Sequence, residues 1–160
     1  MIEVITTGGT IDKVYFDKKS DYQVGEPFIG DLLTKMNVNV DYKICPLMRV
    51  DSLDMNDDDR EKILNHIINS KYDKILITHG TDTIVDTAVY LNQLKNKTVV
   101  LTGSLKPALF IDNDAIFNIG SAFVAVQSLA LGVYIIMNGQ VFKPLNCRKN
   151  INKNIFEKIN

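Results

Sequence analysis

The chain has 160 residues, 46% of them hydrophobic, and its 18 basic and 19 acidic side chains give a formal charge of -1. A chain of this size can bury the core of one ordinary domain, so we expect a single domain over residues 1–160 with no second domain. The nearly balanced charge gives no electrostatic basis for nucleic acid or an anionic membrane as a partner. No apolar run is long enough to span a bilayer, and a small molecule or a protein is the expected partner.

The two cysteines, Cys45 and Cys147, are far apart in the sequence. Two cysteines are too few for a disulfide scaffold, so we expect free thiols and a reducing compartment. The sequence opens on Met1 and an apolar strand pattern, without a basic segment followed by a long apolar one. These features together predict a cytoplasmic protein.

Five short β-branched runs predict strands, and most are almost continuously apolar, which is typical of parallel strands buried on both faces. They cover residues 2–6, 39–44, 74–78, 98–102 and 132–137. Helices are predicted between them, over residues 57–69, about 82–94 and 115–129. This alternation predicts an α/β fold: a single doubly wound, mostly parallel open sheet with helices on both faces, of the Rossmann or flavodoxin-like type. The polar tail 149–160 is expected to fray.

Small polar motifs follow three of the predicted strands: residues 6–10 (TTGGT), 78–83 (THGTDT) and 102–104 (TGS). The carboxyl ends of parallel strands meet at one edge of an open sheet, where ligands bind, so these loops should converge there. Glycines allow close backbone approach, and Thr81 or Asp82 can cap the next helix. The pattern indicates an oxyanion or carboxylate site.

Each motif alone is equally compatible with an ordinary turn or helix cap. The spacing of Gly8 and Gly9 matches neither a dinucleotide fingerprint nor a phosphate-binding P-loop, so we expect no nucleotide cofactor. The acidic run at residues 57–59 fits a helix start better than a calcium loop.

The threonine hydroxyls need a group that accepts their proton before they can act as nucleophiles. His66 falls on a helix position that looks exposed, and His79 is favoured as a packed strand-end residue, which leaves Lys149 and Tyr22 as candidate activators. Because the histidines are distant and the cysteines do not cluster, we expect no zinc site, no other metal and no cofactor.

The motifs Thr7-Gly8-Gly9-Thr10-Ile11 and His79-Gly80-Thr81-Asp82-Thr83 resemble, in this order, the two signatures of the bacterial-type L-asparaginases. The resemblance is to the amino-terminal domain of that family. It implies an amidohydrolase that acts on L-asparagine or a related small amino acid amide and releases ammonia.

The resemblance also implies roles for single residues, here given by their numbers in this chain. Thr10 is the implied nucleophile, Tyr22 lies on a loop that closes over the substrate, and Thr81, Asp82 and Lys149 form a second catalytic group. The residues implied in substrate binding are Gly9, Ser52, Gly80, Thr81, Asp82 and Ser104. Leu53 stands where secreted-type relatives place a glutamine against the substrate carboxylate.

Two functions remain open from the sequence. The first is an amidohydrolase that covers its site by homo-oligomerisation, as a dimer or tetramer. The second is a non-catalytic or partner-dependent amino-acid-binding domain that uses the same loops. Ammonia release separates the two, because a binding domain shows only ligand-induced stabilisation.

Overall fold

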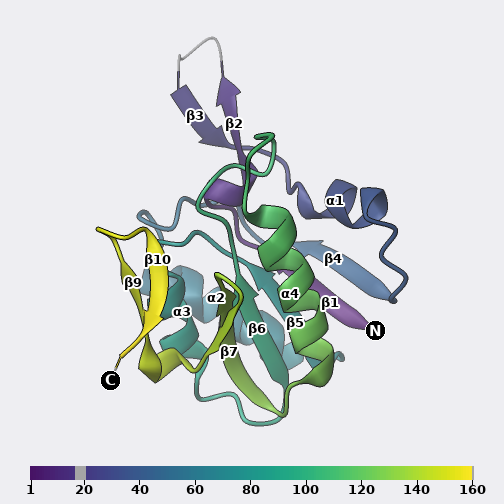
Figure 1. Ribbon diagram of the computed structural model, residues 1–160. Helices are drawn as coiled ribbons and strands as arrows, with labels where there is room; N and C mark the ends of the chain where they lie inside the picture. Colours follow the sequence, from purple (N-terminus) through teal and green to yellow (C-terminus); the bar gives the residue numbers. More distant parts are fainter. Residues whose placement is uncertain (17–20, 160) are drawn as a thin grey trace.

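The computed structural model describes residues 1–16 and 21–159, which are organised around a six-stranded sheet (Figure 1). The sheet order is β4-β1-β5-β6-β7-β8. Its strands are β1 (Ile2–Thr6), β4 (Tyr42–Pro46), β5 (Lys74–Thr78), β6 (Thr98–Thr102), β7 (Gly132–Met137) and β8 (Gln140–Phe142). All pairs are parallel except that of β7 with β8. The five parallel strands therefore have the flavodoxin-like order 2-1-3-4-5, which confirms the predicted fold class.

Four helices cover the two faces of this sheet. Helices α1 (Ile29–Lys35) and α4 (Ala115–Ser128) pack on one face, and α2 (Asp57–Asn69) and α3 (Ile84–Leu91) pack on the other. Along β5, Ile75 and Ile77 join the α2–α3 core, whereas Leu76 joins the α1–α4 core. Because successive side chains of a strand alternate in direction, a strand covered on both faces is apolar at every position.

The start of α2 has the chemistry expected of a helix amino terminus. The Asn56 side chain accepts from the backbone N–H of Asp59, and the Asp59 carboxylate accepts from the backbone N–H of Asn56. This capping box, with the acidic residues 57–59 in the first turn, satisfies backbone donors and complements the helix dipole.

The structure corrects three local predictions. Strand β4 begins at Tyr42 rather than at residue 39, and α3 spans Ile84–Leu91 rather than 82–94. The tail does not fray: β9 (Cys147–Asn150) and β10 (Ile155–Lys158) pair as an antiparallel hairpin. Cys147 and Phe156 anchor it, since both are buried in the core on the α3 side of the sheet. The burial of Cys147 and Phe156 therefore orders the tail.

A second antiparallel hairpin, which the sequence pattern did not predict, follows β1. It consists of β2 (Lys13–Phe16) and β3 (Asp21–Val24), and it projects from the body of the molecule (Figure 1). A one-turn helix, Thr10–Asp12, joins β1 to this hairpin, and another, Pro144–Asn146, precedes β9. In the described ranges, no helix has both the length and the apolar character needed to cross a bilayer.

Candidate functional site

The loops after β1 and β5 lie at the switch point of the sheet. From β1 the chain continues to β4 on one side, whereas the strands after β5 extend to the other side. In open α/β sheets, ligands bind at such a point, outside the carboxyl ends of the strands. Thr10 follows β1 and Thr81 follows β5, so the two candidate hydroxyls lie in the loops after the two strands that flank the switch point.

Glycines allow these loops to touch. A Cβ atom built on Gly9 would lie 2.4 Å from the Gly80 Cα atom, and one built on Gly80 would lie 2.5 Å from the Ser52 side chain. Gly9 also has a φ of +93°, a conformation that other residues rarely adopt. The two glycines are therefore required for the β1 loop, the β5 loop and the loop that holds Ser52 to stack on one another.

Lys149 completes a polar group with two residues of the β5 loop. Its Nζ atom lies 2.9 Å from Thr81 Oγ1 and 2.7 Å from Asp82 Oδ1. Thr81 is buried, the Lys149 side chain is 15% exposed, and the Asp82 side chain is 39% exposed. The pairing of β9 with β10 holds Lys149 in register opposite Phe156. The structure thus joins three of the residues that the sequence predicted, including one from the tail.

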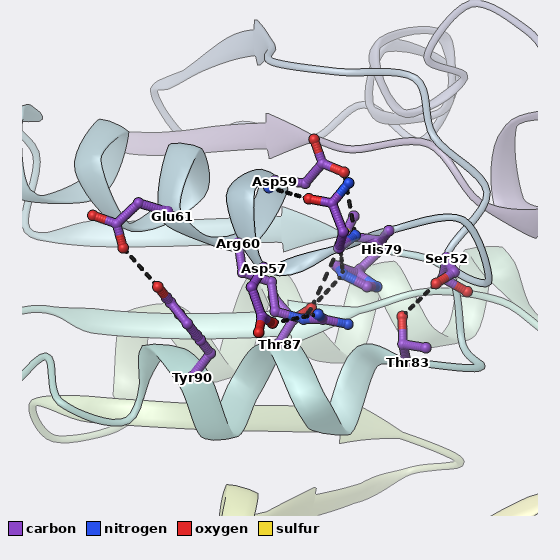
Figure 2. Close-up of polar contacts among 11 residues, drawn as sticks. Ser52, Asp57, Asp59, Arg60, Glu61, His79, Thr83, Thr87 and Tyr90 are labelled. Carbon is purple, nitrogen blue, oxygen red and sulfur yellow. Dashed lines mark hydrogen bonds and ion pairs between the residues drawn. The ribbon is translucent and has the colours of Figure 1, made fainter.

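His79, at the start of the β5 loop, connects this loop to Thr87 of α3 (Figure 2). His79 is fully buried, its Nδ1 lies 2.7 Å from the Gly80 carbonyl oxygen, and its Nε2 lies 2.9 Å from the Thr87 hydroxyl on α3. Burial lowers the pKa of His79 to about 4, so the ring is neutral; the proton is assigned to Nδ1, which faces a carbonyl oxygen, and Nε2 accepts from the Thr87 hydroxyl. His79 therefore orients the Gly80 peptide, as the packed strand-end reading predicts.

Ser52 lies on the adjoining loop, and it is buried against Gly80. The Thr83 hydroxyl donates to the Ser52 carbonyl at 2.7 Å, which connects this loop to the start of α3 (Figure 2). Thr83, rather than Thr81 or Asp82, occupies the N-cap position of α3, and its side chain makes no capping bond there. The predicted capping role of Thr81 and Asp82 is therefore wrong.

Thr10 and Tyr22, the other two predicted catalytic residues, are more exposed than Thr81. Thr10 is half-buried and opens the one-turn helix after β1. Tyr22 on β3 is 44% exposed, and its ring packs edge-on against Tyr15 at 5.4 Å and Phe110 at 6.1 Å between centroids. Within residues 1–16 and 21–159, no hydrogen bond links either residue to the Lys149 group.

Asp12 is a buried carboxyl group that sequence reasoning missed. Its Oδ1 accepts from the Phe28 N–H at 2.9 Å, and its backbone oxygen accepts from the Gly25 N–H at 2.8 Å. These bonds tie the two ends of the hairpin that carries Tyr22. Burial raises the pKa of Asp12 to about 6, although the Phe28 N–H acts in the opposite direction. The position of Asp12 directly after the TTGGTI run was the available sequence signal.

The β6 loop carries Ser104, whose hydroxyl donates to the Lys106 carbonyl and so stabilises the turn. Asp114 accepts from the backbone N–H groups of Leu105 and Lys106, and Asn118 donates to the Gly103 carbonyl at 3.0 Å. In this arrangement, the Ser104 hydroxyl donates within its own loop and can still accept a hydrogen bond.

A pocket of about 320 Å³ opens beside the Lys149 group. Its lining includes Asp82 and Lys149 together with the apolar side chains of Leu53, Val85 and Ile151. Leu53 is 73% exposed at this pocket. A larger pocket of about 550 Å³ lies elsewhere, where Glu3 of β1 and His66 of α2 line it.

The chain is similar to L-asparaginases in both sequence and structure. The chain is 31% identical over 154 residues to L-asparaginase 2 of Escherichia coli strain K12, and 32% identical over 152 residues to a probable periplasmic L-asparaginase of Haemophilus influenzae. Each match covers 88% of this chain and 43% of the relative. The crystal structure of a probable cytoplasmic L-asparaginase from Campylobacter jejuni superposes with a TM-score of 0.82 at 27% identity, over 98% of this chain and 52% of that one.

The chain thus spans about half the length of these relatives. The family model described as Asparaginase, N-terminal, matches residues 1–159. That match confirms the resemblance carried by the two sequence motifs. The chain belongs to the asparaginase family and corresponds to the amino-terminal domain of that family.

Proposed function

We propose that this chain carries the catalytic half-site of a threonine amidohydrolase, which hydrolyses the side-chain amide of L-asparagine or a related small amide. The observation that carries the proposal is the contact of Lys149 Nζ with both Thr81 Oγ1 and Asp82 Oδ1, beside the loop of Thr10. An amine that bridges a hydroxyl and a carboxylate offers a path for a proton, which is what a hydroxyl nucleophile needs. The names of the relatives support the same reaction.

In the proposed reaction, the Thr10 oxygen attacks the amide carbon and forms a C–O bond. The C–N bond then breaks, and the leaving nitrogen takes a proton and departs as ammonia. Water hydrolyses the resulting ester, which releases the acid and restores the hydroxyl of Thr10. We assign the proton transfers to the Thr81–Asp82–Lys149 group, assisted by the Tyr22 hydroxyl.

Backbone and side-chain groups of the stacked loops bind the substrate in this proposal. The Asp82 carboxylate attracts the α-ammonium group, and the Ser52 hydroxyl donates to the α-carboxylate. Gly9 and Gly80 lack side chains, so their peptide groups can approach the reacting carbonyl and stabilise its oxyanion. A free amino acid amide has both charges that these groups recognise.

The proposal includes a homo-oligomer, dimer or tetramer, in a reducing compartment such as the cytoplasm. The exposed apolar side chains of Leu53 and Ile151 beside the site support coverage by another subunit. Cys45 and Cys147 are both free thiols, in keeping with reducing conditions. Light scattering that shows a monomer at assay concentration would count against the oligomer.

The test of the reaction is ammonia release by the wild type and by Thr10→Ala. Both are offered L-asparagine, L-glutamine, D-asparagine and a short asparaginyl peptide. We expect release by the wild type and a loss of at least about 10⁴-fold in Thr10→Ala, as for the loss of other nucleophiles. Thr34→Ala, an exposed threonine on α1, is the matched control and should keep full activity.

Undiminished release by Thr10→Ala would remove Thr10 from the mechanism. If the wild type releases no ammonia from any of the four compounds but its melting temperature rises with one of them, the chain is an amino-acid-binding domain instead.

A further inference from the structure

Three side chains with different donor atoms meet under α2, on the face of the sheet opposite α4. They are Glu3 of β1, Cys45 of β4 and His66 of α2. One donor atom of each, a carboxylate oxygen, the sulfur and a ring nitrogen, lies within 4.8 Å of the other two. The candidate active site contains none of these three residues.

The fold brings these residues together from distant parts of the sequence. Glu3 has the same side-chain direction as Ile5, which packs in the α2–α3 core. Strand β4 pairs with β1 in parallel, with Ile5 opposite Cys45, so Cys45 faces the same side. His66 comes from the second half of α2, which lies across this edge of the sheet. The three donors thus link an edge strand, its neighbour and the covering helix.

The hydrogen bonds of Glu3 leave its carboxylate oriented for a further ligand. Glu3 is 4% exposed, its Oε1 lies 3.1 Å from His66 Nε2, and its Oε2 accepts a hydrogen bond from the Ser70 hydroxyl. Ser70 Oγ in turn accepts from the Tyr72 N–H at 3.2 Å. A carboxylate that accepts hydrogen bonds from a hydroxyl and an imidazole still has lone pairs with which it can bind a metal ion.

We propose that Glu3, Cys45 and His66 form a zinc site. Thiolate, imidazole and carboxylate are the three protein ligands that Zn²⁺ takes, and this mixed set of soft and hard donors favours Zn²⁺ over Mg²⁺ or Ca²⁺. Zinc bonds of about 2.0–2.3 Å place tetrahedral ligands about 3.3–3.8 Å apart, so the donors need only a small closing movement. The pocket of about 550 Å³, lined in part by Glu3 and His66, gives access for the ion and for water as a fourth ligand.

The balance of the binding step is simple. The Cys45 thiol loses its proton to solvent as the zinc–sulfur bond forms. The proton of His66 Nε2 moves through solvent to Nδ1, so the neutral ring binds zinc through Nε2, and the Glu3–His66 hydrogen bond is replaced by two bonds to the metal. The bond from Ser70 to Glu3 Oε2 remains, and it fixes the carboxylate as hydrogen bonds to metal ligands commonly do. Sequence reasoning excluded zinc because the histidines are far apart. The site uses one histidine, which is partly buried rather than a surface residue, and the fold supplies the other two ligands.

The test uses the whole chain, stripped of metal and titrated with Co²⁺, which occupies tetrahedral zinc sites and absorbs light. The expected result is one Co²⁺ per chain, with a sulfur-to-cobalt charge-transfer band in the near ultraviolet that Zn²⁺ abolishes. Cys147→Ser, which alters the other free cysteine, should keep the band, and Cys45→Ser should lose it. Circular dichroism before each titration shows that the variants are folded.

Zinc affinity, measured in competition with a chromophoric chelator, extends the test to the other ligands. We expect the dissociation constant to rise at least about 100-fold in Cys45→Ser and in His66→Gln, and about 10-fold in Ser70→Ala, because loss of an outer partner has the smaller effect. A wild type without the thiolate band overturns the proposal. So does a band or an affinity that Cys45→Ser and His66→Gln leave unchanged.

Discussion

The two halves of the candidate site differ in how firmly they are held. The β5 half is enclosed: Thr81 is buried, Lys149 bridges it to Asp82, and His79 fixes the peptide before it. The β1 half is open: Thr10 is half-buried, and Tyr22 lies on a projecting hairpin. The Thr81–Asp82–Lys149 group proposed to move protons is thus held by contacts within the fold, whereas the proposed nucleophile Thr10 and the proposed assisting residue Tyr22 are more exposed.

The largest expected effect comes from breaking the enclosed half at Lys149. Lys149→Met keeps the length of the side chain and removes the amine, so we expect kcat to fall about 1,000-fold, within the range for loss of a general acid–base group. The matched control is Arg148→Met, the preceding residue on β9, whose side chain pairs with Glu157 instead. Steady-state ammonia release should be unchanged in the control. Equal activity in Lys149→Met and Arg148→Met would refute the proposed role.

The pH dependence of stability tests how Asp12 anchors the open half. Its pKa is raised from 3.8 to about 6 in the fold, so the folded state binds the extra proton between these values. The stability that this proton contributes is complete below pH 3.8 and is lost as the pH rises through 6. Asp12→Asn cannot titrate, so relative to the wild type it should gain at most about 3 kcal/mol between pH 4 and pH 7.

Urea denaturation across this pH range measures the Asp12 effect, and Asp51→Asn is the control with the opposite sign. Burial raises the pKa of Asp51, but the hydrogen bond from Lys13 and backbone N–H groups outweigh it and lower the pKa. The contribution of Asp51 is therefore lost as the pH falls rather than as it rises. A difference between Asp12→Asn and the wild type that does not change with pH would show that Asp12 is not held as described.

Thr87→Val removes the hydroxyl that donates to His79 Nε2 and accepts from Arg60 Nε, and so leaves both of these buried atoms without that partner. We expect a loss of about 2 kcal/mol in the free energy of unfolding, the usual cost of an unsatisfied buried polar group. Thr34→Val, on the exposed side of α1, should cost less than about 0.5 kcal/mol. Similar losses in the two variants, measured by urea denaturation, would contradict a special role for the His79–Thr87 contact.

In the open half, Tyr22→Phe separates the role of the Tyr22 hydroxyl from that of its ring. The substitution keeps the ring contacts with Tyr15 and Phe110 and removes only the hydroxyl. We expect about a 10-fold loss in kcat, less than a full proton-transfer group contributes because Tyr22 only assists, and no measurable change in melting temperature. Tyr15→Phe, on the neighbouring strand of the hairpin, should keep full activity. A melting temperature that falls with Tyr22→Phe would indicate a structural role instead.

The parts of the fold that depend on periodicity were predictable from the sequence. The alternation of apolar runs with an amphipathic helix such as α2 indicated the doubly wound sheet, and the loop motifs indicated which edge holds the site. The β9–β10 hairpin was not predictable in this way, because its buried side chains, Cys147 and Phe156, are separated by a run rich in Asn and Lys. The β2–β3 hairpin is half-exposed and short, so its residues show no strong alternation.

The candidate site shows the same division. Residues within the two motifs, such as Thr10 and Thr81, were recognisable in the sequence, whereas the partner of a buried side chain was not. Asp12 illustrates this limit, because its carboxylate accepts from the backbone N–H of Phe28, 16 residues further along the chain. Such contacts depend on the folded positions of segments that are separated in the sequence.

Thr10 and Lys149 act in one reaction in the proposed mechanism. A double-mutant cycle on ammonia release measures whether the effects of these two residues are coupled. The rates of the wild type, Thr10→Ala, Lys149→Met and the double variant are compared with the same substrate. If the two halves work as a unit, the double variant is no slower than the slower single variant. If the losses of the two single variants multiply in the double variant, the two residues act independently, and the account of a single site is wrong.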